Sequence, residues 1–209
     1  MTDKDIKVLI VEDHEATLKG LVAEISQTDG MRVVGAASNC QDGLRQLDEF
    51  CPDVVLLDLH LPDSEGPRSL AGSFCENSNS KIIVFSGDSR IAIRDLILKS
   101  GVSGYLLKSE PMANIMDAIR SVVSNDRQIV SAELTENSSD SKLTKAEEHL
   151  LMLIARGLKY KDIAKERFTA PETVRKQVDQ ILVKLDMESR EELIAWAVEN
   201  GYGTVDVER

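Results

Sequence analysis

Short, wholly apolar runs alternate with segments of helical periodicity along the first 125 residues. The apolar runs predict five strands, at residues 6–11, 31–37, 54–57, 82–85 and 105–107. Between and after them, apolar residues recur at helical spacing, most clearly over residues 114–123. Because the strands are apolar throughout instead of alternating, both faces of their sheet must be covered, as in parallel sheets. The pattern predicts a five-stranded, doubly wound parallel α/β domain over residues 1–124.

The periodicity is lost over residues 125–142, which read NDRQIVSAELTENSSDSK and are rich in Ser, Asn, Asp and Glu. This composition predicts a linker. No strand pattern returns after it, and four short helices are predicted at residues 144–156, 160–168, 171–185 and 189–199. Residues 143–209 are therefore expected to form a small all-α domain. We expect its last helix to expose Leu193, Trp196 and Ala197 as a candidate dimer surface, with burial of Trp196 in the core as the alternative.

Charge is distributed unevenly between the two predicted domains. The net charge is -11, of which residues 1–141 carry -10 and residues 142–209 carry -1. This argues against general polyanion binding by the whole chain, yet residues 156–184 hold eight Lys or Arg against four Asp or Glu. Three cysteines without metal-binding spacing suit a reducing compartment. With no signal peptide or membrane-spanning run predicted, we expect a cytoplasmic protein.

Polar residues follow several of the predicted strands directly. Glu12 and Asp13 follow the first, Asp58 the third and Lys108 the fifth, and Ser86 ends the fourth. Carboxyl ends of parallel strands meet at one edge of a sheet, where ligands bind. Asp13 alone could cap a helix, and Lys108 alone could be a solvated charge, but together they indicate a site.

Three neighbouring carboxylates repel one another unless a cation lies between them. Carboxylate oxygens with few nitrogen donors favour Mg²⁺. A lysine and a small hydroxyl nearby can hold a phosphoryl group, and an aspartate can form an acyl phosphate. The sequence therefore predicts phosphorylation of Asp58, whose charge is compensated by a metal ion and by Lys108.

Residues 6–123 resemble a response-regulator receiver domain, the CheY-like fold, in the motifs VEDH, LLDLHLP with Gly66, VFSG and GYLLK. The resemblance implies that Asp58 is the phosphoacceptor and that Asp13, Asp58 and the His60 backbone carbonyl hold Mg²⁺, with Glu12 in support. It also implies that Ser86 and Lys108 contact the phosphoryl group and that Tyr105 is the aromatic switch residue. The departures are Glu65, where Asn or Asp is usual, and Gly87, where Ala is commoner.

Residues 143–185 resemble the helix-turn-helix of LuxR-type regulators, and the whole chain resembles the NarL/FixJ subfamily of response regulators. In the helix from Pro171, apolar residues form one stripe, which leaves a polar face free to enter a major groove. The predicted DNA-binding residues are Arg175, Lys176, Asp179, Gln180 and Lys184. Two departures stand out. Ala170 takes the place of a capping Ser or Thr, which Thr169 could replace, and Asp179 puts a negative charge on the DNA-facing side.

The resemblance implies a phosphorylated transcription regulator and not a conventional enzyme. A sensor histidine kinase would phosphorylate Asp58, and promoter DNA and a second copy of the chain would be its further partners. Catalysis would be limited to its own phosphotransfer and slow dephosphorylation. The alternative is a receiver that acts through protein partners, with weakened DNA binding. A haloacid dehalogenase-type phosphatase is disfavoured because His60 replaces its second acid, and a flavodoxin-like carrier because EDHEATLKG is not a phosphate loop.

Overall fold

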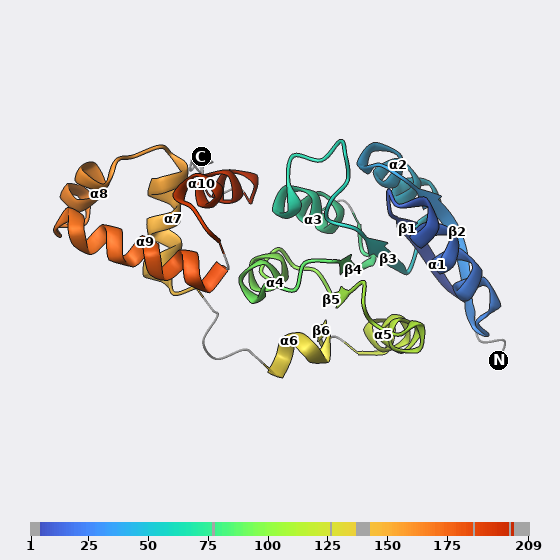
Figure 1. The fold of residues 1–209 in the computed structure, drawn as a ribbon. Helices are drawn as coiled ribbons and strands as arrows, with labels where there is room; N and C mark the ends of the chain where they lie inside the picture. Colours follow the sequence, from blue (N-terminus) through green and yellow to red (C-terminus); the bar gives the residue numbers. More distant parts are fainter. Residues whose placement is uncertain are drawn as a thin grey trace. The chain divides into compact units, whose positions relative to one another are not determined.

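The computed structural model describes residues 5–76, 78–125, 127–136, 143–185, 187–200 and 202. The chain divides into two units, one formed mainly by residues up to Glu136 and the other by the residues after it (Figure 1). Residues 137–142 of the predicted linker, and the outer ends of both predicted domains, lie outside the described residues.

A parallel sheet forms the centre of the first unit. Its strands are β1 (Ile6–Val11), β2 (Met31–Ala37), β3 (Val54–Leu57), β4 (Lys81–Ser86), β5 (Gly104–Leu107) and β6 (Ile129–Val130). They lie in the order β2-β1-β3-β4-β5-β6 within the described part of the chain. From β1 the chain passes first to one neighbour, β2, and then to the other, β3. The sheet order therefore reverses at β1, and the carboxyl ends of β1 and β3 flank the point where such sheets bind ligands.

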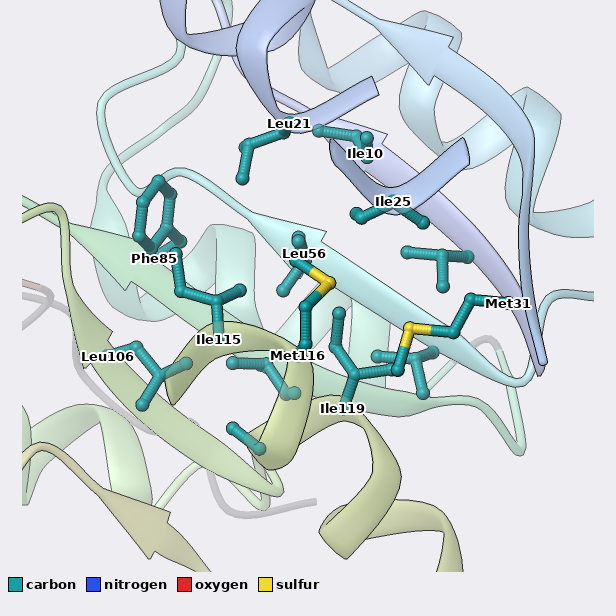
Figure 2. Packing of buried hydrophobic residues seen from close by; sticks show 14 of the residues in the cluster. Ile10, Leu21, Ile25, Met31, Leu56, Phe85, Leu106, Ile115, Met116 and Ile119 are labelled. Atoms are coloured by element: carbon teal, nitrogen blue, oxygen red, sulfur yellow. The ribbon is translucent and has the colours of Figure 1, made fainter. Parts of the chain in front are cut away.

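Helices cover both faces of this sheet. They are α1 (Glu15–Gln27), α2 (Cys40–Phe50), α3 (Pro67–Glu76), α4 (Ile91–Leu98) and α5 (Met112–Ser124). Leu21 and Ile25 of α1 join Ile115 and Ile119 of α5 in a core against alternate strand residues such as Ile10 and Leu56 (Figure 2). On the opposite face α2 and α3 pack closely, since a Cβ added at Gly43 would lie 3.0 Å from Phe74 of α3.

The predicted architecture is confirmed, with one difference at the edge of the sheet. A sixth strand, β6, and a short helix, α6 (Ala132–Glu136), form within the segment predicted as linker. Ser131 between them donates its N–H to the Tyr105 carbonyl at 3.1 Å, and its Oγ accepts the Leu107 N–H at 2.9 Å. The buried Arg94 of α4 donates to the Leu134 carbonyl. A two-residue strand is too short to show a periodic pattern, so the sequence did not reveal it.

The second unit contains four described helices, α7 (Lys145–Ala155), α8 (Tyr160–Glu166), α9 (Pro171–Leu185) and α10 (Arg190–Glu199). A capping box begins α7: Thr144 Oγ1 accepts the Glu147 N–H, and the Glu147 carboxylate accepts the Thr144 N–H. The core is largely aliphatic, with Leu150, Ile154, Ile163, Val174, Val178, Ile181, Leu185 and Leu193 among its buried residues.

The expectation of an exposed apolar face on α10 is wrong, and the alternative, burial of Trp196 in the core, is confirmed. Leu193 and Ala197 are fully buried, and Trp196 is only 5% exposed, with its ring 5.7 Å from that of Tyr202. These side chains belong to the core of the second unit, because α10 packs against α7 and α9. They therefore offer no surface to a second copy of the chain.

Candidate functional site

The polar residues that end the strands of the first unit meet at one edge of the sheet. Val11 pairs with Leu57, Leu57 with Val84, and Ser86 with Leu107, so all four strands end at the same edge and β4 and β5 extend two residues beyond β1 and β3. Lys108 Nζ donates to Glu12 Oε1 at 2.8 Å and to Asp58 Oδ2 at 2.9 Å. Ligand atoms of Glu12, Asp13, His14 and Asp58 lie within 4.8 Å of one another. The structure thus brings the predicted acidic residues and the lysine into one cluster.

Burial makes the charges of this cluster strongly interdependent. Glu12 is 1% exposed and Asp58 is 2% exposed, whereas Asp13 is at the rim. Burial alone would lower the pKa of Lys108, but its hydrogen bonds to Glu12 and Asp58 outweigh this and raise that pKa. Lys108 therefore stays charged at neutral pH, yet one ammonium does not balance three carboxylates. The excess negative charge is what a divalent cation would neutralise.

The donor set fits a hard cation. Lys108 Nζ lies 2.8 Å from Glu12 Oε2 as well. Both carboxylate oxygens of Glu12 are therefore in contact with this one ammonium, although only Oε1 accepts a hydrogen bond from it among the described residues. Carboxylate oxygens at a site open to water on one side match the preference of Mg²⁺ for oxygen ligands and retained waters.

Two histidines flank this cluster. His14 is largely exposed, and its Nδ1 lies 3.1 Å from Asp13 Oδ1. His60 donates its N–H to Asp58 Oδ1 at 3.3 Å. A metal bond from its carbonyl stays a prediction.

Ser86 and Tyr105 are connected through the loop that follows β4. Both residues are buried completely. Ser86 Oγ accepts the N–H of Asp88 at 3.1 Å, and the Tyr105 hydroxyl donates to the carbonyl of Asp88 at 2.9 Å. The backbone of Asp88 therefore joins the two predicted switch residues. Sequence reasoning missed Asp88 because its side chain carries no motif and the contact uses only its backbone.

The second candidate region is the outer face of α9. Val174, Val178, Ile181 and Leu185 are buried as the apolar stripe predicted, and Arg175, Lys176, Asp179 and Gln180 are exposed. Lys184 differs from these four, because its Nζ lies 2.8 Å from Glu147 Oε1 at the start of α7. Burial would raise the pKa of Glu147, but hydrogen bonds from Lys184 and Thr144 lower it. DNA contact by each of the five residues stays a prediction.

The turn between α8 and α9 has a backbone conformation unusual for its sequence. Phe168 has a φ of 52° and is 98% exposed. The N–H of Phe168 bonds to the Lys165 carbonyl and that of Thr169 to the Ala164 carbonyl, which is a Schellman ending of α8. The carbonyl of Ala170 accepts the first hydrogen bonds of α9, from Thr173 and Val174. Among the contacts of the described residues, neither Thr169 nor Ala170 caps α9 with its side chain.

The fold and the charged site together define the class of the protein, a response regulator with a helical output domain. Residues 8–120 match the response regulator receiver domain, and residues 141–197 match the luxR family of bacterial regulatory proteins. The chain belongs to the response regulators, and within them to the NarL/FixJ subfamily with a LuxR-type DNA-binding domain.

Similar proteins extend over nearly the same length. The chain is 34% identical to the transcriptional regulatory protein DesR of Bacillus subtilis (strain 168), covering 94% of this chain and 98% of DesR. It is 29% identical to the nitrate/nitrite response regulator protein NarL of Escherichia coli (strain K12), covering 90% and 93%. A structure of RcsB from Salmonella enterica serovar Typhimurium, bound to promoter rprA with phosphomimetic BeF3-, has a TM-score of 0.74. Its 21% identity, over 93% of this chain and 99% of that one, shows likeness of fold.

No helix in the described ranges is long and apolar enough to cross a membrane.

Proposed function

We propose that this chain is a transcription regulator that is switched by phosphorylation of Asp58 and acts by binding promoter DNA through α9. The observation that carries the proposal is the position of Lys108, which hydrogen-bonds to both Glu12 and Asp58 where the strands end. Such an arrangement has no packing role to explain it, because burying two carboxylates beside one ammonium is unfavourable without further compensation.

In the proposed reaction, an Asp58 carboxylate oxygen attacks phosphorus. An O–P bond forms between Asp58 and phosphorus. The bond that breaks joins phosphorus to the imidazole nitrogen of a sensor histidine kinase, or to the leaving group of a small phosphodonor, and that group departs. Mg²⁺, when bound, would neutralise developing charge on the phosphoryl oxygens, and its ligands would be Asp13, Asp58 and the His60 carbonyl, with Glu12 in support. Lys108 and the hydroxyl of Ser86 would then contact the phosphoryl oxygens. Hydrolysis of the acyl phosphate by water would end the signal.

Phosphorylation would act on the rest of the domain through Ser86. The Ser86 O–H would donate to a phosphoryl oxygen, and rotation of the side chain toward that oxygen would lengthen the bond in which Ser86 Oγ accepts the Asp88 N–H. Since the Asp88 carbonyl also accepts from Tyr105, a change in this loop would reach Tyr105 directly. In this proposal, a second arrangement of the loop in the phosphorylated state would provide the bistable element that a phosphorylation switch requires.

The test is intact-mass measurement after incubation with a small phosphodonor and Mg²⁺. We expect a single phosphoryl adduct that is lost in Asp58→Asn and in Asp13→Ala. Lys108→Ala should impair signalling more than metal binding. Undiminished phosphoryl uptake by Asp58→Asn would refute the assignment.

DNA binding and dimerisation form the second half of the proposal. Light scattering with and without a phosphoryl mimic should show association on phosphorylation, because paired half-sites are read by dimers. A monomer that is unchanged at micromolar concentration would count against dimerisation.

A specific observation keeps a second candidate function open. Asp179 is exposed on the α9 face, and Lys184 is held by Glu147, so fewer cations are free on that face than the sequence suggests. In this alternative the chain acts through protein partners, with weakened DNA binding. If the phosphorylated protein ignores promoter DNA even at low salt, where phosphate contacts are strongest, the alternative replaces the main proposal.

A further inference from the structure

The loop between β3 and α3 carries the backbone carbonyl of His60 and is attached to the molecule at several points. At its beginning, the Asp58 N–H donates to the Val11 carbonyl at 2.9 Å. Leu59 and Leu61 are buried, and the Leu61 carbonyl accepts from both the N–H and the hydroxyl of Ser64. Between these contacts, Asp63 points outward to a different element.

Asp63 binds the first turn of α2 with both of its carboxylate oxygens. Oδ1 accepts the N–H of Cys40 at 2.7 Å, and Oδ2 accepts the N–H of Gln41 at 3.0 Å. These two donors lower the pKa of the Asp63 carboxyl. The first N–H groups of a helix have no partner within the helix, and they carry its positive dipole end. The contact therefore joins a negative loop residue to a fixed positive point more than twenty residues earlier in the chain.

The helix α2 already has a cap of its own. Asn39 precedes the helix, and its side-chain oxygen accepts the N–H of Asp42 at 2.8 Å. Asp63 therefore supplements this cap, and its carboxylate links α2 to the loop that follows Asp58. The loop is held at Asp58 by β1 and at Asp63 by α2, with His60 between the two attachment points.

We infer that Asp63 is a positioning residue for the cation site: its bond to α2 fixes the loop that holds the His60 backbone, whose N–H donates to Asp58 Oδ1, beside the acidic cluster. The inference rests on the proposed function, since it concerns the Mg²⁺ site of the phosphoacceptor. Groups that orient metal ligands typically change metal affinity when they are removed, even though they do not touch the metal.

Two variants at the same helix end separate positioning from simple capping. Asn39→Ala removes the cap of α2 but leaves the β3–α3 loop unchanged, whereas Asp63→Ala removes the link between them. Titration of the unphosphorylated full-length proteins with Mg²⁺ by calorimetry should show roughly tenfold weaker binding in Asp63→Ala. Asn39→Ala should bind Mg²⁺ like the original protein. Asp63→Asn, which keeps one acceptor oxygen, should be intermediate and provides a second variant if Asp63→Ala folds poorly.

Phosphoryl uptake gives an independent readout. In Asp63→Ala the uptake rate at low Mg²⁺ should fall about as much as the affinity, and saturating Mg²⁺ should restore it. A loss of rate that Mg²⁺ does not restore would mean that the site itself is damaged, and it would overturn a role in positioning.

The thiol of Cys40 reports on the link without any phosphotransfer. Burial and the neighbouring Asp63 charge raise the pKa of this thiol, in that order. If the link and the cation support each other, Mg²⁺ should slow alkylation of Cys40 in the original protein but not in Asp63→Ala. The exposed Cys51 serves as the internal control.

The possible failures can be distinguished. If the original protein binds no Mg²⁺ and takes up no phosphoryl group, the proposed function fails and the inference fails with it. If the original protein does both, but Asp63→Ala and Asn39→Ala behave alike, only the inference is overturned and Asp63 is a helix cap.

Discussion

Tyr105 and Ser86 bind opposite ends of the same loop residue: the phenol donates to the carbonyl of Asp88, and the serine hydroxyl accepts its N–H. Tyr105→Phe removes one of these bonds and keeps the buried ring. We expect phosphoryl uptake at Asp58 to be nearly unchanged, because Tyr105 is not in the acidic cluster. Phosphorylation should raise dimerisation or DNA affinity less in Tyr105→Phe than in the original protein. The fold should lose about 1 kcal/mol, the usual contribution of a hydrogen bond. Equal gain in DNA affinity by both proteins would argue against a relay through Asp88.

The ion pairs of Lys108 predict a dependence of stability on alkaline pH. Because the pKa of Lys108 is raised in the folded protein, its contribution is complete below the unfolded pKa of about 10.4 and is lost as pH rises through the folded pKa. Lys108→Met lacks this contribution, so it should be less stable at pH 7 and should lose less stability than the original protein above about pH 10. Denaturant unfolding across this range checks the prediction, and parallel profiles for the two proteins would contradict it.

Phe168→Gly should stabilise the second unit. Phe168 adopts the left-handed conformation at the end of α8, which costs a residue with a Cβ about 1 kcal/mol, and its exposed ring contributes little packing. The chain holds a matched comparison, because α7 ends in the same kind of turn with Gly157 at a φ of 78°. Gly157→Ala should therefore destabilise the unit by a similar amount. Thermal unfolding of both variants tests the pair. A destabilised Phe168→Gly would show that the ring contributes to folding.

The exposed side chains of α9 predict two distinguishable kinds of DNA contact. Arg175→Ala should weaken binding to all sequences alike and reduce the slope of log affinity against log salt by about one unit, as loss of a phosphate contact does. Lys176→Ala should instead relax preference at one base position, by roughly 1–3 kcal/mol. Salt titrations with specific and random duplexes separate the two outcomes. If the two variants have the same effect, the assignment of separate roles is wrong.

Asp179 is the residue whose role the sequence left most open. If its carboxylate accepts a hydrogen bond from a cytosine N4, Asp179→Ala should lose specificity. If it only repels phosphate, the same variant should bind every duplex more tightly. Competition between specific and random DNA decides between these results. An unchanged affinity for both would place Asp179 outside the interface.

Sequence reasoning succeeded where one local pattern determines the structure. Runs such as Ile6–Val11 and Val54–Leu57 are strands with the predicted bounds, because an apolar segment bounded by polar residues has few alternatives in a buried sheet. Because the carboxyl ends of parallel strands lie at one edge of the sheet, Glu12, Asp58 and Lys108 then come together without further information.

Prediction from the sequence failed for contacts whose two residues are distant in sequence, and for contacts that use only backbone atoms. Neither the bond of Asp63 to α2 nor the position of Asp88 between Ser86 and Tyr105 has a spacing signature, since both are consequences of tertiary packing. The prediction of an exposed apolar face on α10 was wrong for a related reason. Taken alone, the apolar residues of this helix indicate a surface, because the sequence does not show that α7 and α9 cover them.

If Lys184 contacts DNA as predicted, its ion pair with Glu147 makes the beginning of α7 a competitor of DNA. If Lys184 turns to a phosphate, Glu147 loses a cation that helps keep it ionised as part of the capping box with Thr144. By thermodynamic reciprocity, a helix start that holds Lys184 firmly weakens the phosphate contact, and a phosphate that attracts Lys184 loosens the helix start. With such a contact, the first turn of α7 would be an adjustable element through which sequence changes outside the DNA-binding face of α9 would tune DNA affinity.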